Sequence, residues 1–115
     1  MGEEIQIRRA ARSDVAYIQR NKSRVVHANH FSFRFVVRGP GHAITCSISK
    51  KVARGAVQRN KIKRWCREAI RQNYSLLKKP TTGIMQTRTT LGLSFKGARE
   101  EIRDIFMKVQ KQMTE

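Results

Sequence analysis

Apolar residues recur with helical spacing between Gly55 and Asn73. When this segment is drawn at about 100° per residue, its apolar members share one arc and its polar members share the opposite arc. The apolar arc contains Ile62, Trp65, Cys66, Ala69 and Ile70, and the polar arc contains Asn60, Lys63, Arg64, Arg67 and Arg71. The pattern predicts a helix that packs on a core with one side and presents a basic side to its surroundings.

Residues 31–38 alternate with a period of two instead. Phe31, Phe33 and Phe35 fall on one side of the segment, and Arg34 falls on the other. This alternation is typical of a half-buried strand. The phenylalanines either form the core or offer stacking platforms for bases. Because the chain has only eight aromatic residues to fill a core, we favour the first interpretation.

The sequence Gly39-Pro40-Gly41 predicts a tight turn, which leads into a return strand from His42 to Lys50. Ser47 and Ser49 share one side of this strand. Small hydroxyl side chains let a ligand backbone approach closely. Both serines are therefore candidate contacts in a cleft.

A short helix is predicted near the start of the chain, with Ser13 as its N-cap and Asp14 in its first turn. Val15 and Tyr17 contribute to its apolar side, and it ends near Asn21. The next residues, 22–29, are polar and basic and predict a loop.

Two histidines, His27 and His30, are three residues apart. No third ligand follows at a suitable spacing, so we do not interpret them as a metal site. Cys46 and Cys66 are the only cysteines. With no paired C-x-x-C motif, we interpret them as small buried residues rather than metal ligands or disulfide partners, as suits a reducing compartment.

The last third of the chain predicts a connector over residues 76–83, a weakly patterned strand over 84–90, and a helix that Ser94 caps. The apolar positions of that helix have helical spacing. They are Ala98, Ile102, Ile105, Phe106, Val109 and Met113. The element order predicts one α+β domain over residues 1–115, in which three helices pack on a small mixed sheet of about four strands.

The charge is the strongest compositional feature. Lys and Arg number 25 against eight Asp and Glu, which gives a formal net charge of +17 and a pI near 11.3. Nine of these cations and a single acid, Glu68, lie between Lys50 and Arg71. A solvated helix side normally mixes the two signs. The imbalance indicates a polyanionic partner, and residues 1–12, with three arginines, predict a flexible basic arm that can lie on phosphate.

A membrane partner is the weaker interpretation of the same charge. The chain has no run of 18 apolar residues, and its first residues are acidic with no apolar stretch behind them. We expect a cytoplasmic protein.

One stretch carries a family resemblance. Ile48-Ser49-Lys50-Lys51 is followed by Gly55 and then by Arg59-Asn60-Lys61-Ile62-Lys63-Arg64-Trp65-Cys66-Arg67-Glu68. This resembles the bacterial ribonuclease P protein family, in which a strand ending in Ser-Lys-Lys leads into a helix of the form R-N-[RK]-x-K-R-x-x-R-E. The resemblance extends in order from about Asp14 to Ile105.

The resemblance implies a fold in which the basic helix connects parallel strands by a left-handed crossover. It also implies a function: the protein subunit of ribonuclease P, which assists a catalytic RNA in removing the 5′ leader of precursor tRNA, with one protein per RNA. The chemistry then belongs to the RNA and its Mg²⁺ ions, with no catalytic residue in this chain. The expected contacts with catalytic RNA are Arg59, Asn60, Lys61, Lys63, Arg64, Arg67, Arg71, Lys50 and Lys51.

The family also carries a cleft that receives the leader, lined in part by aromatic residues of the first helix. Here Val15 and Gln19 stand at the equivalent positions, with Tyr17 the nearest aromatic. The expected leader contacts are Arg34, Ser47, Ser49, Val15 and Tyr17.

Three other functions remain open at this stage. A general RNA-binding or ribosomal-type protein would share the charge without affecting tRNA maturation. A self-sufficient nuclease would need paired carboxylates, a nucleophile with its base, or an acidic cluster for two metals, and the sequence shows none of these motifs. A DNA-binding helix-turn-helix is disfavoured because no second helix is predicted within a short turn of the basic one.

Overall fold

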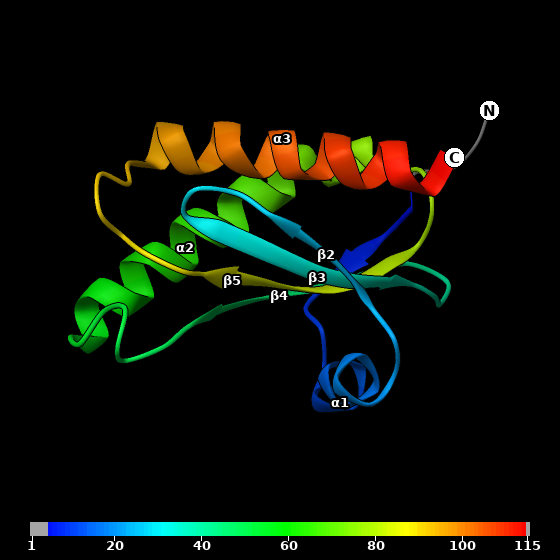
Figure 1. Ribbon diagram of the computed structural model, residues 1–115, viewed down its shortest axis with the longest axis horizontal. Coiled ribbons are helices and arrows are strands. Elements are labelled where there is room, and N and C mark those ends of the chain that lie inside the picture. The colour runs from blue at the N-terminus through cyan, green and yellow to red at the C-terminus, as the bar shows by residue number, and fades with distance from the viewer. Residues whose placement is uncertain (1–4, 115) are drawn as a thin grey trace.

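One mixed sheet of five strands organises the protein (Figure 1). The computed structural model describes residues 5–114. Its elements in chain order are β1 (Ile7–Arg8), α1 (Arg12–Arg20), β2 (Arg24–His27), β3 (Phe31–Val37), β4 (His42–Ile48), α2 (Ala56–Asn73), the short 3₁₀ helix η1 (Tyr74–Leu76), β5 (Thr81–Thr87) and α3 (Phe95–Thr114).

The strand that comes last in the chain lies at the centre of the sheet. The order is β1-β4-β5-β3-β2, with β5 parallel to β4 and antiparallel to β3. The expected pairing of residues 42–50 with 31–38 as a hairpin is therefore wrong, because β5 lies between them. The basic helix α2 connects the parallel neighbours β4 and β5, as expected for a mixed α+β sheet.

The two faces of the sheet are covered differently. Helices α2 and α3 pack together over one face, and α1 lies against the other, below the sheet in Figure 1. The side chains of Phe31, Phe33 and Phe35 are almost fully buried beneath α2 and α3. The ring centroids of Phe33 and Phe106 are 5.4 Å apart in an edge-on arrangement. The phenylalanines thus form the core, as predicted, and offer no stacking platform.

Gly83 shows how tightly this core is built. It pairs with Phe35 in the register of β5 and β3, and the ring of Phe33 lies directly over it. A Cβ atom at this position would overlap the Phe33 ring and would also lie 3.0 Å from the carbonyl oxygen of Arg34. A side chain here would therefore force the two strands and the aromatic ring apart.

Several boundaries differ from the prediction. Residues 22–29 contain the strand β2 instead of a loop, so the sheet has five strands and not four. The strand predicted over 84–90 begins earlier, at Thr81, and ends at Thr87. The connector before it contains η1. A strand as short as β2 offers too few residues for its alternation to stand out from a polar loop.

The predicted basic arm is partly ordered. Ile7 and Arg8 form β1, which is parallel to β4 at the sheet edge, and the His42 N–H donates to the Gln6 carbonyl oxygen at 2.7 Å. Residues 7 and 8 of the predicted arm are therefore part of the sheet. Its first four residues lie outside the described part of the chain.

The predicted cap of α1 is also wrong. The N-cap is Ala11, not Ser13, and the Asp14 carboxylate accepts the Ala11 N–H at 2.8 Å. The predicted cap of α3 is confirmed, since Ser94 Oγ accepts the Gly97 N–H at 3.0 Å. Both helices thus satisfy an otherwise free backbone donor with a local side chain.

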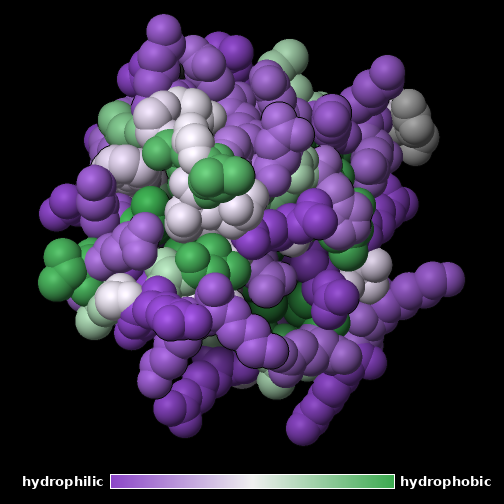
Figure 2. All heavy atoms as spheres, turned by 60° about the vertical axis from the view of Figure 1, so that its left-hand side comes forward, coloured by the Kyte–Doolittle hydropathy of each residue, from purple (hydrophilic) through white to green (hydrophobic). Residues whose placement is uncertain are grey.

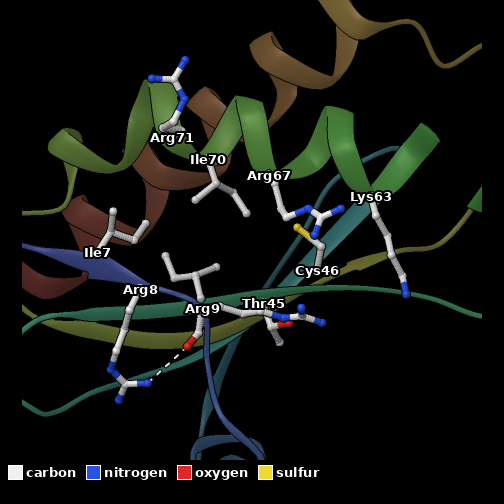
Figure 3. A pocket seen from close by; sticks show the side chains of 10 residues that line it. Ile7, Arg8, Arg9, Thr45, Cys46, Lys63, Arg67, Ile70 and Arg71 are labelled. Carbon is white, nitrogen blue, oxygen red and sulfur yellow. Dashed lines mark hydrogen bonds between the residues drawn. The ribbon is translucent and has the colours of Figure 1, made fainter. Parts of the chain in front are cut away.

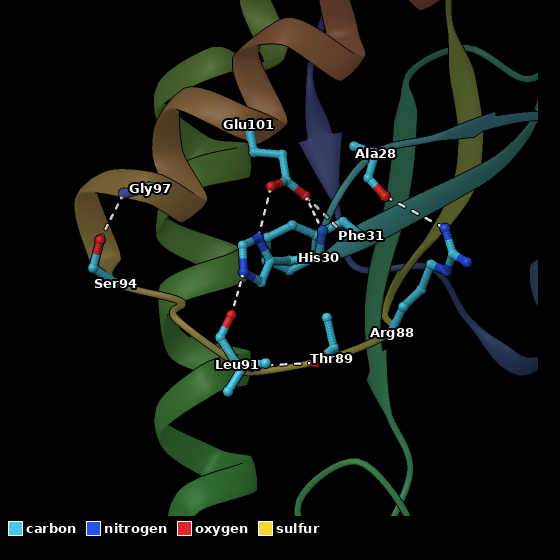
Figure 4. Close-up of polar contacts among 9 residues, drawn as sticks. All are labelled: Ala28, His30, Phe31, Arg88, Thr89, Leu91, Ser94, Gly97 and Glu101. Atoms are coloured by element: carbon cyan, nitrogen blue, oxygen red, sulfur yellow. Dashed lines mark hydrogen bonds and ion pairs between the residues drawn. The ribbon is translucent and has the colours of Figure 1, made fainter.

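A polar clamp joins the β2–β3 turn to α3 (Figure 4). Glu101 accepts the backbone N–H groups of His30 and Phe31 at 2.7 and 2.9 Å, and its other oxygen lies 2.9 Å from His30 Nδ1. His30 Nε2 lies 2.7 Å from the carbonyl oxygen of Leu91. Both ring nitrogens therefore face acceptors, and the hydrogen bond with Glu101 raises the pKa of His30 above its ordinary value.

Within residues 5–114, no helix is both long and apolar enough to cross a membrane.

Candidate nucleic-acid interface

The two sides of α2 separate as the sequence predicts. Ile62, Cys66, Ala69 and Ile70 are buried, whereas the cations Arg64 and Arg67, among others, are exposed. We call the exposed positions Asn60, Lys61, Arg64, Arg67 and Arg71, together with the partly exposed Lys63, the basic surface of α2. Figure 2, which brings forward the left-hand side of Figure 1, shows a face covered mostly by hydrophilic side chains with small apolar patches between them.

Two of the predicted RNA contacts also have structural partners. The Arg59 guanidinium donates to the carbonyl oxygens of Ala53 and Arg54 at 3.0 and 2.6 Å, which closes the turn before α2. The Lys61 amine lies 4.9 Å from the centroid of the Trp65 ring, a cation–π distance. These contacts fix the start of the helix.

The predicted contacts Lys50 and Lys51 are exposed in the turn that follows β4. They stand at the sheet end from which the chain enters α2, and within residues 5–114 their side chains take part in no hydrogen bond or ion pair. They are free to meet a partner.

Arg71 differs from the other cations of α2 because it has an acidic neighbour. Its guanidinium forms an ion pair with Glu68, one turn earlier, and this bond lowers the pKa of the Glu68 carboxyl. Glu68 is the only acid in α2. The charge of Arg71 is thus partly balanced, and the unbalanced field lies toward Lys63, Arg64 and Arg67.

A pocket of about 210 Å³ lies between α2, β4 and β1 (Figure 3). We call it the basic pocket. Its apolar lining comes from Ile7, Ile44 and Ile70, and Thr45 and Cys46 complete the strand side. Its cations are Arg8, Arg9, Lys63, Arg67 and Arg71. Figure 3 shows the Arg67 side chain directed toward Cys46, whereas the Arg71 side chain points away from the pocket.

The sequence did not identify Arg8 and Arg9 as members of a site. Both were assigned to a loose arm, because two residues of strand are too few to produce a periodic signal. Arg8 pairs in parallel with Ala43 of β4, 35 positions later in the chain, and Arg9 follows directly after this strand. No local pattern could have revealed it.

A second cavity, of about 610 Å³, lies on the opposite face of the sheet, beside α1. We call it the sheet cleft. The predicted residues Val15, Arg34 and Ser47 all line it. The complete lining is Val15, Gln19, Val25, His27, Ser32, Arg34, Thr45, Cys46, Ser47, Ile84 and Gln86. Polar and apolar side chains alternate there, and Arg34 supplies a cation.

Two of the predicted cleft residues lie elsewhere. The guanidinium of Arg38 lies 4.0 Å from the centroid of the Tyr17 ring. Tyr17 does not line the cleft. Ser49 has left the strand, and its carbonyl oxygen accepts the N–H groups of Val52 and Ala53, both at 3.1 Å. Its place is the turn that leads toward α2.

Several cleft residues were missed by the sequence analysis. Val25 and His27 belong to β2, which was expected to be a loop, and Gln86 belongs to a strand whose start was misplaced. The position of Ser32 in the cleft could have been predicted, because the alternation of residues 31–38 places it on the same side as Arg34. A search for polar residues at every second position could have found Ser32 and Gln86.

Strand β4 separates the basic pocket from the sheet cleft. Thr45 and Cys46 border both cavities. A ligand bound to α2 and a ligand bound in the cleft would therefore be separated by little more than the thickness of one strand.

The position of α1 beside the cleft depends on Asp14. Its carboxylate is buried and accepts the Arg8 guanidinium at 2.8 Å, with Arg38 3.7 Å away. The hydrogen bond from Arg8, followed by that from the Ala11 N–H, lowers the pKa of Asp14. This contact joins α1 to the edge strand β1, so the wall of the cleft and the rim of the basic pocket share one anchor.

A family model described as ribonuclease P matches residues 6–110. The chain belongs to the ribonuclease P protein family. Membership implies a role in tRNA processing, as part of an endoribonuclease complex that includes the ribonuclease P RNA. A comparison with curated proteins finds no match.

Solved structures of ribonuclease P proteins share this fold. The RNase P protein from Thermotoga maritima is 23% identical, with 88% of this chain and 97% of that chain covered and a TM-score of 0.75. An RNase P protein from Staphylococcus aureus is 21% identical, with 87% and 92% covered and a TM-score of 0.70. A second S. aureus structure is 23% identical, with 96% and 93% covered and a TM-score of 0.72.

Proposed function

We propose that this chain is the protein subunit of a bacterial ribonuclease P, with one protein per catalytic RNA, acting in the cytoplasm. The basic surface of α2, with Arg59, Lys50 and Lys51, contacts phosphates of the catalytic RNA. The sheet cleft receives the 5′ leader of precursor tRNA, with Arg34 and Ser47 as polar contacts. Tyr17 and Ser49 stand outside the cleft lining and would meet the leader only beyond it.

The observation that carries this proposal is the arrangement of two cavities across β4. One side offers closely spaced cations on a helix, which suits the phosphates of a folded RNA. The other side offers a larger cavity with a mixed lining and a guanidinium, which suits a single strand. A protein built this way can hold two RNA segments next to each other, as an assisting subunit must.

Magnesium ions would be held by the RNA and the substrate. Within residues 5–114, the structure shows no group of three or more His, Cys, Asp or Glu side chains that could hold a metal ion. The acids near the proposed RNA surfaces, Asp14 and Glu68, are engaged by arginines. We therefore assign the protein an indirect effect: by neutralising phosphates it improves substrate affinity and the occupancy of Mg²⁺ sites in the RNA.

The proposal gives the protein no catalytic residue. Its work is to bind and to position, because the described residues that line the two cavities include no carboxylate. Cleavage of the precursor by the protein alone would contradict this assignment.

The decisive experiment measures cleavage of precursor tRNA at low Mg²⁺ concentration by a bacterial ribonuclease P RNA. Reactions with RNA alone, protein alone and both components are compared. We expect stimulation only when both are present. Tight RNA binding without stimulation would instead favour a general RNA-binding protein.

The double variant Arg64→Ala/Arg67→Ala tests the surface on α2. It should weaken binding to the catalytic RNA by about tenfold or more and reduce the slope of log affinity against log salt by roughly 1.5 to 2. The matched control is Arg103→Ala/Lys108→Ala, which removes two exposed cations from α3. Circular dichroism should show unchanged helix content in both. Equal losses in both variants would show that only the total charge matters.

A further inference from the structure

The two cysteines of the chain meet across the core. Cys46 lies on β4 and Cys66 on α2, 20 positions later, and their Sγ atoms are 2.7 Å apart. Both are free thiols. The proposed RNA contacts assign no role to either thiol, although Cys46 borders both cavities.

The two thiols differ in access. Cys66 is completely buried under α2, and this burial raises the pKa of its thiol well above the ordinary value. Cys46 is only partly buried and lines the basic pocket. Reagents can therefore reach Cys46 from the pocket, whereas Cys66 can be reached only by way of Cys46.

The pocket also selects reagents by charge. Figure 3 shows the Cys46 sulfur between β4 and α2, with the Arg67 side chain directed toward it and Lys63 pointing down from the same helix. Arg9 adds a further cation at the strand side, whereas the guanidinium of Arg8 is paired with Asp14. Such a rim raises the local concentration of anions and lowers that of cations.

We propose that Cys46 and Cys66 form a thiol–disulfide exchange site for anionic low-molecular-weight disulfides. In the first step, Cys46 loses its proton to solvent and its sulfur attacks one sulfur of the incoming disulfide. A mixed disulfide forms, and the other half leaves as a thiol after taking up a proton. In the second step, the Cys66 sulfur attacks Cys46 Sγ, its proton passes to the departing group, and a second thiol leaves. Two electrons pass from the cysteines to the reagent.

The product is a covalent link between β4 and α2. It joins the strand that borders both cavities to the helix that carries the basic surface. The contact of the two thiols before reaction means that no large movement has to precede closure of the bond. The proposal is independent of RNA binding and can be tested on the isolated protein.

The first test treats the reduced protein with glutathione disulfide and follows its mass and its free thiols. The wild type should lose both thiols and two hydrogen atoms, gain no glutathione and remain monomeric on a non-reducing gel. Cys66→Ser should retain one glutathione, because the second step is blocked. Cys46→Ser should react at least about tenfold more slowly than the wild type, because Cys66 is buried.

Three results would overturn the proposal. They are two free thiols in the treated wild type, a stable glutathione adduct on the wild type, and disulfide-linked dimers as the main product. The wild-type result decides even if a serine variant fails to fold.

The second test examines the role of charge. Glutathione disulfide, which is anionic, should react roughly three- to tenfold faster than cystamine, which is cationic, after correction for their reactivity with a free thiol. Arg67→Gln should reduce this preference, whereas the distant control Arg103→Gln should leave it unchanged. If the wild type, Arg67→Gln and Arg103→Gln all show the same preference for glutathione disulfide over cystamine, the assignment of anionic reagents is refuted.

Discussion

The two faces of the sheet are built from the same strands, but one is buried in the core and the other is open to a ligand. On β3, Phe31, Phe33 and Phe35 point toward α2 and α3 and are buried, whereas Ser32 and Arg34 between them face the sheet cleft. The first face is dry and closely packed. The second is covered only in part, by a single short helix, and remains open to a ligand.

This difference shows how a small chain accommodates both a core and a binding site. A strand with period-two alternation can give every second residue to stability and every second residue to recognition. Substitutions on one face should therefore change stability, and substitutions on the other should change binding. The following predictions test this separation, beginning with the largest expected effect.

Phe33→Ala should lower the free energy of unfolding by about 3–5 kcal/mol, because it leaves a cavity against Phe35, Phe106 and Gly83. The control is Ser32→Ala, its neighbour on the cleft side, which should change stability by less than about 0.5 kcal/mol. Urea denaturation measures both. Similar losses in the two variants would show that the faces are not independent.

Asp14→Asn should cost about 1–3 kcal/mol, since it weakens a buried carboxylate's bonds to Arg8 and the Ala11 N–H. Because these bonds lower the pKa of Asp14, its contribution is present above the ordinary value of 3.8 and is lost as pH falls through the folded-state pKa. The matched control is Asp104→Asn, an exposed acid on α3. The check is the melting temperature of the wild type and of Asp14→Asn, measured between pH 3 and 7. If the two melting temperatures change with pH in parallel, the prediction is contradicted.

Arg34→Ala should weaken binding of a precursor tRNA with a 5′ leader by several-fold, about 1 kcal/mol, while leaving the unfolding free energy nearly unchanged. Binding of mature tRNA, which has no leader, should stay the same. Comparing the affinities of the reconstituted complex for the two substrates measures the effect. If both substrates lose affinity equally, the guanidinium acts elsewhere than on the leader.

The smallest expected effect concerns the clamp on the helix-packed side. Glu101 raises the pKa of His30, so the stabilising contribution is complete below the ordinary value of 6.5 and is lost as pH rises through the folded-state pKa. The free energy of unfolding of the wild type minus that of His30→Gln should therefore shrink by about 0.5–1 kcal/mol toward alkaline pH. Buried His42 contributes equally to both proteins and cancels. If this difference in unfolding free energy does not change with pH, the stabilising contribution assigned to the contact of His30 with Glu101 is contradicted.

The parts of the fold that could be predicted are those with a local signal. The buried and exposed sides of α2, the core side of β3 and the Ser94 cap each follow from residues within a few positions of one another. The parts that were missed depend on distant partners. Strand β1 exists because of β4, β2 because of β3, and Gly83 is central because of Phe33.

The candidate site shows the same limit. Val15, Arg34 and Ser47 could be assigned to one cleft because each lies on an element with a clear pattern or a family resemblance. Tyr17 and Ser49 were misplaced because small rotations of a helix and the exact end of a strand decide where such side chains point. The basic pocket could not be foreseen, since Ile7 and Arg8 reach it through a parallel pairing with no local signature, and Arg9 follows them.

The central place of β5 has a consequence for how the chain acquires its fold. Residues 81–87 are made after every other strand, yet they lie between β3 and β4. A nascent chain that ends at Lys79 therefore holds two strands, β3 and β4, that do not pair directly with each other in the native sheet, and three phenylalanines that still lack α3. The native sheet can therefore be completed only after residues 81–87 have left the ribosome.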